Sequence, residues 1–243
     1  KRPIALDEEE ALLAQLLSDQ PLATIGMLAG LLEAGVEPAH VARVVALAAA
    51  ERIARFHTQN EFSDWVEVLH TFTHAHAVHE RVRHGAEPLV LRAVFHGAMA
   101  VYLDRFLNVP AVSRPEPDPT LDVSDPSVLL KLLERRQSTD DAARWVVSFL
   151  AAGGDRGALL NALGHALLRE DAEFHSFQMY EAAVVECDRW AERSDAFAAR
   201  AQVTMLVALA RYLAAHAPTA RELPHTAHIA MRLGRGEKLF EAE

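Results

Sequence analysis

The sequence has one cysteine, few lysines and no long hydrophobic run. The single cysteine, Cys187, excludes an internal disulfide and any cysteine-ligated zinc or iron–sulfur cluster built from this chain alone. No apolar stretch approaches the roughly 20 residues that span a bilayer, and the first residues lack the apolar core of a signal peptide. We therefore expect a cytoplasmic protein with no membrane partner.

Basic residues are also fewer than acidic residues. The chain has 34 acidic residues against 24 basic ones, which gives a formal net charge of −10. No basic stripe offsets this excess, so we do not expect nucleic acid as a partner. Hydrophobic residues make up 51% of the sequence, and alanine and leucine are abundant, which favours a globular helical protein.

Helical periodicity runs through almost the whole chain, and no segment alternates as a strand does. Residues such as Asp7 and Asp64 can cap helices, while Gly35 and Gly85 can end them. The predicted fold is all-α, with about ten helices in one domain over residues 1–243. The predicted helices cover 8–18, 21–34, 38–57, 64–84, 88–108, 127–137, 140–152, 156–169, 171–192, 195–216 and 225–233.

Proline marks the middle of the chain. Five of the eleven prolines fall in residues 110–126, which predicts an irregular connection there. This connection would join two halves, 7–109 and 124–216, that could be repeats of one another in a pseudo-duplicated helical bundle.

A gapless alignment supports that duplication, although alanine-rich helices also align by chance. Residues 33–57 match residues 151–175 with few identities. If the duplication is real, two histidines occupy equivalent places in the bundle. The aligned pairs are Gly35 with Gly153, Phe56 with Phe174, and His57 with His175.

Histidine is the abundant functional side chain, with thirteen copies that concentrate in residues 56–84 and 165–175. Imidazole is the commonest metal ligand and titrates near neutral pH. Several of these histidines adjoin apolar or aromatic residues, and three or more neutral imidazoles suit Fe(II), Zn(II), Mn(II) or Cu(II). We therefore predict a buried metal site whose ligands are His57, His70, His165 and His175, with His228 as a further ligand.

Acidic residues accompany the predicted ligands. Glu61 and Asp64 precede one histidine helix, and Asp171 lies four residues before His175. We expect these carboxylates to orient ligands or to act as acid/base groups. His96 lies in an apolar run and is expected to face inward, either as a core histidine or as a catalytic residue. The histidines set aside as structural or solvated are His40, His76, His79, His84 and His216.

Two segments resemble the questin oxidase-like proteins: VLHTFTHAHAVHERVRHGAEPLVLRAVFHGAMAVY at 68–102 and LLNALGHALLREDAEFHSFQMYEAA at 159–183. Residues 159–183 are similar to that family's His-Pro-x-x-His segment, where His175 matches the later histidine and Asp171 replaces the earlier one. The tail 225–233 resembles its late His-x-x-Lys segment. The chain also resembles the helical region that precedes Rieske-type domains in some bacterial proteins.

The resemblance implies a non-haem Fe(II) oxygenase or oxidase that uses O2 on an apolar, aromatic, polyketide-like small molecule in natural product biosynthesis. A Rieske- or ferredoxin-type protein would supply electrons, and a homodimer is a further expectation. Here His228 stands where the family has lysine, so the ligand set departs from the family pattern. The alternatives are a zinc-type hydrolase with the same ligands, non-covalent haem held by two histidines, and a non-enzymatic helical ligand-binding scaffold.

Overall fold

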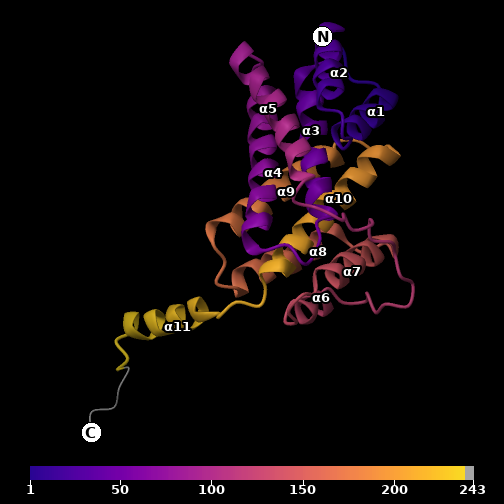
Figure 1. Ribbon diagram of the computed structural model, residues 1–243. Helices are drawn as coiled ribbons and strands as arrows, with labels where there is room; N and C mark the ends of the chain where they lie inside the picture. The colour runs from indigo at the N-terminus through magenta and orange to yellow at the C-terminus, as the bar shows by residue number, and fades with distance from the viewer. Residues whose placement is uncertain (239–243) are drawn as a thin grey trace.

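The computed structural model describes residues 1–238 and is entirely helical apart from its connections (Figure 1). Over these residues it contains eleven α-helices and no β-strand, which confirms the predicted all-α class. The helices are α1 (Leu6–Leu16), α2 (Pro21–Glu33), α3 (Pro38–Ala54), α4 (Phe62–Arg83), α5 (Pro88–Asp104), α6 (Ser127–Leu132), α7 (Thr139–Ala151), α8 (Arg156–Arg169), α9 (Phe174–Ala191), α10 (Ala196–His216) and α11 (Glu222–Gly234).

Helices α3 and α10 form the centre of the molecule. Nearly every residue of α3 is buried, and so is most of α10. Both helices are rich in alanine, and small side chains let neighbouring helix axes approach closely. Helix α3 packs against α4, α5 and α10, while α10 packs against α7 and α9, so these two helices join the halves of the chain (Figure 1).

The two aligned segments have the same helix–turn–helix outline. Gly35 and Gly153 each follow a helix with a left-handed backbone, at φ values of 80° and 82°, which glycine adopts without steric cost. Each turn leads into a helix that begins at the aligned position, α3 at Pro38 and α8 at Arg156, and the segments differ only at their ends. His57 lies in the connection before α4, whereas His175 lies in the first turn of α9. The shared turns therefore do not place the two histidines in equivalent positions.

The proline-rich connection at residues 110–126, all of them described, forms no helix. It is nevertheless fixed to the helices that it crosses. The Val112 N–H donates to the Arg55 carbonyl at 3.0 Å, and the Arg55 side chain donates back to the Val112 carbonyl at 3.1 Å. The Trp145 indole N–H donates to the Asp122 carbonyl at 3.0 Å. These bonds hold the connection against the end of α3 and the middle of α7.

Helix α11 stands apart from the rest of the molecule (Figure 1). Within the described chain, none of its residues is buried. Asp171 holds its first turn, because this carboxylate accepts the backbone N–H of Glu222 at 2.6 Å and of Leu223 at 2.8 Å. A carboxylate at this place satisfies backbone donors and interacts favourably with the helix dipole.

Across residues 1–238, every helix is too short or too polar to span a lipid bilayer.

Candidate functional site

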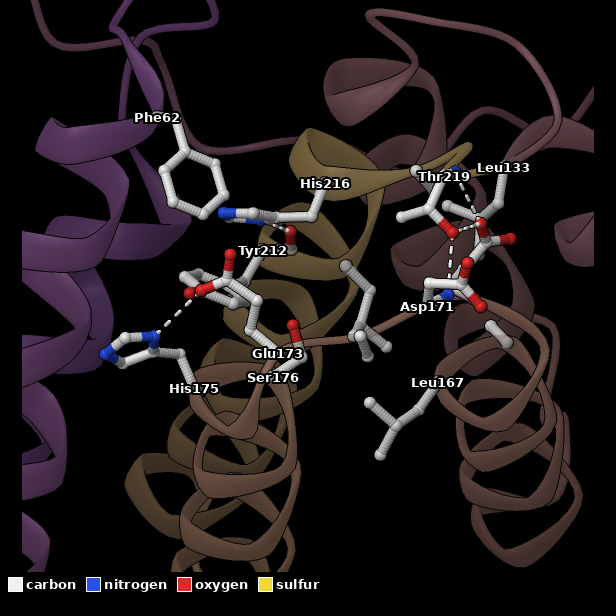
Figure 2. A pocket seen from close by; sticks show the side chains of 15 residues that line it. Phe62, Leu133, Leu167, Asp171, Glu173, His175, Ser176, Tyr212, His216 and Thr219 are labelled. Atoms are coloured by element: carbon white, nitrogen blue, oxygen red, sulfur yellow. Dashed lines mark hydrogen bonds and ion pairs between the residues drawn. The ribbon is translucent and has the colours of Figure 1, made fainter. Parts of the chain in front are cut away.

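A cavity of about 100 Å³ lies where α4, α8, α9 and α10 meet. Its walls are mostly apolar, and Leu167 and Leu213 are among the side chains that form them. The polar groups gather on two sides. Figure 2 shows Glu173, His175, Tyr212 and His216 together on one side, with Asp171 and Thr219 on the other.

Tyr212 and His216 bring two buried polar atoms to this cavity. Neither the Tyr212 hydroxyl nor the His216 Nε2 has a hydrogen-bond partner within residues 1–238. The His216 ring stacks on the Tyr212 ring with 4.2 Å between centroids. Leaving such atoms without partners costs about 1–3 kcal/mol each, so they mark a place where a ligand can bond.

The protonation of these two residues is set by burial. His216 Nδ1 lies 2.7 Å from the Tyr212 carbonyl, so it carries the proton and Nε2 is an acceptor. Burial lowers the pKa of His216, although the carbonyl bond and the charge of Glu173 act in the opposite direction. Burial also raises the pKa of Tyr212 above its usual value, with a smaller contribution from Glu173. The cavity therefore presents one neutral donor and one neutral acceptor.

A histidine pair lies beside the polar side of the cavity. His70 on α4 and His175 on α9 face each other with ring centroids 5.1 Å apart. His175 Nδ1 lies 3.3 Å from the Glu173 carboxylate, and the Phe174 ring packs on the His175 imidazole at 3.9 Å. Two imidazoles and one carboxylate thus come together from different helices, next to Tyr212 and His216.

Of the five predicted ligands, the structure brings His70 and His175 together and leaves the other three elsewhere. His57 is half-buried before α4, where its Nδ1 accepts the Gln59 N–H at 3.1 Å. His165 is exposed on α8, and His228 is exposed on α11. The predicted five-histidine centre is therefore not assembled.

The predicted acidic residues have structural roles at helix starts. The Glu61 N–H donates to Asp64 Oδ2 at 3.2 Å in the first turn of α4. Asp171 caps α11 on the side of the cavity where Thr219 lies. His96 is exposed on α5, so the expectation that it faces inward is wrong. Helix α5 buries a narrow face that includes Val94 and Ala98, and His96 lies outside that face.

Sequence reasoning missed three of the side chains that gather here. His216 is expected from the sequence to be structural or solvated, yet it lines the cavity with Tyr212 and Glu173. Its four-residue spacing from Tyr212 on an apolar helix is the signal that the sequence offers, because that spacing puts both rings on one helix face.

His79 also differs from expectation, and it lies beside His76 on α4. The sequence predicts that His79 belongs to a solvated helix end, but it is 3% exposed, and His76 is 8% exposed. Helix α9 covers this part of α4, and both imidazoles bond to Glu186. His84, one turn further on, is exposed as expected, and His40 is half-buried.

Comparison with known proteins does not assign the chain to a family. No family model, curated protein or solved structure matches it. Its function is therefore argued from the chemistry of the cavity.

Proposed function

We propose that the protein is a metal-dependent oxidoreductase that binds a small, mostly apolar molecule in the cavity between α4, α8, α9 and α10. The observation that carries the proposal is the pair of unsatisfied polar atoms, the Tyr212 hydroxyl and His216 Nε2, in an apolar cavity within the described chain. They lie beside a second polar group formed by His70, Glu173 and His175. Apolar cavities with a few convergent polar groups are typical of small-molecule sites.

The two polar atoms favour a ligand that carries a hydroxyl group. A phenol or alcohol can accept a hydrogen bond from the Tyr212 hydroxyl and donate its own proton to His216 Nε2. Leu167 and Leu213 would contact the apolar part of the molecule. Cavities of roughly 150 Å³ hold a benzene ring, so a cavity of about 100 Å³ suits one small apolar group with the rest toward the mouth.

His70, His175 and Glu173 would hold the metal. Two imidazoles and one carboxylate form the donor set that non-haem Fe(II) oxygenases use, and their chemistry fits the ion. These residues are not among the described groups whose ligand atoms all lie within 4.8 Å, so the exposed His70 side chain would turn toward His175. When bound, iron would supply the activation of O2.

Side chains of the cavity would position the substrate. Tyr212 and His216 fix the hydroxyl of the ligand on the side where Glu173 lies, and the surrounding leucines keep water from its apolar part. Neutral His216 can accept a hydrogen bond from the ligand hydroxyl at Nε2, since burial lowers its pKa and so favours the neutral ring.

Anaerobic Fe(II) binding tests the proposal. Wild-type protein is expected to retain equimolar iron after desalting, while His70→Ala and His175→Ala lose it. His165→Ala is the matched control, because His165 is an exposed histidine on a neighbouring helix. Binding of a simple phenol, followed by intrinsic fluorescence, should weaken in Tyr212→Phe while iron is retained. Equal iron content in wild type, His175→Ala and His165→Ala would contradict the assignment.

A further inference from the structure

A second histidine–carboxylate cluster lies buried between α4 and α9. Glu186 is fully buried, and its Oε1 lies 2.8 Å from His79 Nδ1 and 2.9 Å from His76 Nδ1. His79 is nine residues beyond His70 on α4, which corresponds to about 13 Å along the helix. The cluster is therefore separate from the cavity described above.

Glu80 completes the donor set. The ligand atoms of His79, Glu80 and Glu186 lie within 4.8 Å of one another, and in residues 1–238 they are the one such group. In a tetrahedral site with metal–ligand bonds of about 2.0–2.1 Å, neighbouring ligand atoms are roughly 3.4 Å apart. The hydrogen bonds of 2.8 and 2.9 Å to Glu186 show that these nitrogen and oxygen atoms already approach that separation.

The surroundings of the cluster also suit a metal. His76 Nε2 lies 3.4 Å from a Glu181 carboxylate oxygen. Metal-binding histidines commonly donate their second ring N–H to a carboxylate in this way, which fixes the ring.

Two arginines hold Glu80 at present and lower its pKa to about 2. It now accepts from Arg189 at 3.0 Å and from Arg83 at 3.0 Å. Arg189 also lies 3.4 Å from Glu192, so its guanidinium keeps a carboxylate partner if Glu80 turns inward. A polar cavity of about 200 Å³ borders His79, Arg83 and Arg189, so one side of the cluster lies next to a hollow in the surface.

We propose that His76, His79, Glu80 and Glu186 form a closed site for a divalent transition metal of the Zn(II) or Co(II) class that ties α4 to α9. Two imidazole nitrogens and two carboxylate oxygens supply four ligands, as in structural zinc sites. On binding, the metal takes the place of the Nδ1 protons that now bond to Glu186. Each ring then ligates as a neutral imidazole that carries one proton on Nε2, and any second ring proton leaves to solvent. This site is independent of the proposed iron site.

Cobalt titration tests the proposal in a background that lacks the other site. The protein used is the full chain carrying His70→Ala and His175→Ala, followed by visible absorption of Co(II). Tetrahedral Co(II) bands are expected, with Zn(II) displacing the cobalt. Adding Glu80→Gln should weaken Co(II) binding by about 10–100-fold or more, in the range seen when metal-site partners are lost. Because Glu80 is half-buried at the surface, this variant is expected to fold.

His84→Gln is the matched control, since His84 is an exposed histidine at the end of the same helix. It should leave the cobalt spectrum unchanged. Hydrogen exchange should slow in α4 and α9 when Zn(II) is added to the background protein, and the effect should disappear with Glu80→Gln. A folded background protein without Co(II) bands, or bands that persist unchanged in Glu80→Gln, would overturn the site. Neither result bears on iron binding at His175.

Discussion

Individual side chains show two kinds of unsatisfied buried polar atom. The Tyr212 hydroxyl and His216 Nε2 line an apolar cavity, where a ligand can satisfy them. The Asp104 Oδ2 has no partner within the described residues either, although Oδ1 accepts the Thr71 hydroxyl at 3.1 Å. The Tyr212 and His216 atoms therefore indicate a binding site. The Asp104 carboxyl group instead affects the stability of the fold.

Removing the Tyr212 hydroxyl should separate binding from stability. Since this hydroxyl has no partner in the described chain, Tyr212→Phe should leave the free energy of unfolding unchanged or raise it by up to about 1 kcal/mol. Tyr180→Phe is the control, because the Tyr180 hydroxyl donates to the Leu160 carbonyl at 2.9 Å. The free energy of unfolding of that variant, measured by urea denaturation, should be about 1 kcal/mol lower than that of wild type. Equal losses in both variants would mean that the Tyr212 hydroxyl is already satisfied.

Asp104 should make stability fall as pH rises. Burial raises its pKa to about 7, although the Thr71 bond and the charge of Arg52 act to lower it. The unfolded chain loses this proton near its usual pKa of about 4, whereas the folded chain holds it until about 7, so stability declines over that interval. The free energy of unfolding of Asp104→Asn should therefore exceed that of wild type by roughly 1–3 kcal/mol at pH 8, and the two should be nearly equal at pH 4. A difference that does not change with pH in urea denaturation would show that Asp104 is ionised in the folded protein.

At the scale of helices, local signals predicted the elements well. Prolines at helix starts and left-handed glycines such as Gly35 act within a few residues, so the predicted boundaries lie close to the observed ones. The buried face of each helix was harder to predict. His79 is buried because α9 covers it, and His96 is exposed because nothing in the described chain covers that face of α5. The helix that covers a given face is often distant in the sequence, so local patterns do not predict which face is buried.

Helix α11 should be the first element to loosen. Its attachment rests on Asp171, which accepts two backbone N–H groups, while its own side chains in the described chain are not buried. Asp171→Ala should speed hydrogen exchange across 222–234 with little change in the melting temperature. Asp155→Ala, which removes a cap from the packed helix α8, should instead cost about 1 kcal/mol of global stability. Unchanged protection of α11 in Asp171→Ala would mean that other contacts hold it.

At the scale of the whole molecule, a buried charge cluster ties the first helix to the second half of the chain. Glu9 on α1 is fully buried and contacts Arg43 of α3 at 3.0 Å and Arg193, after α9, at 2.6 Å. The Arg43 guanidinium also lies 4.3 Å from the centre of the Trp190 ring. The carboxylate is compensated by two cations, so removing its charge leaves both without their buried partner.

Glu9→Gln and Glu10→Gln make a matched pair of neighbouring substitutions. Glu9→Gln should lower the free energy of unfolding by about 3 kcal/mol, because a buried charge is lost from between two arginines. Glu10 pairs with Arg200 at 2.8 Å, but both side chains are more than half exposed, so Glu10→Gln should cost less than about 1 kcal/mol. Urea denaturation measures both. Equal effects would show that the Glu9 cluster does not link the halves.

The candidate site was the least predictable part of the molecule. The sequence placed His70 and His175 among the ligands, and the structure brings these two together. The spacing of Tyr212 and His216 puts both rings on one face of α10, but spacing does not place that face beside Glu173, because the site draws on α4, the start of α9 and the end of α10. Helix packing, rather than sequence proximity, brings these residues to one cavity.

The most direct test of the proposed site is iron anomalous scattering from crystals of the protein grown with Fe(II) under argon. The proposal predicts an anomalous peak between His70, His175 and Glu173, and its loss in His175→Ala crystals. A well-ordered cavity without that peak, or a peak confined to His79 and Glu186, would contradict the assignment of the iron site.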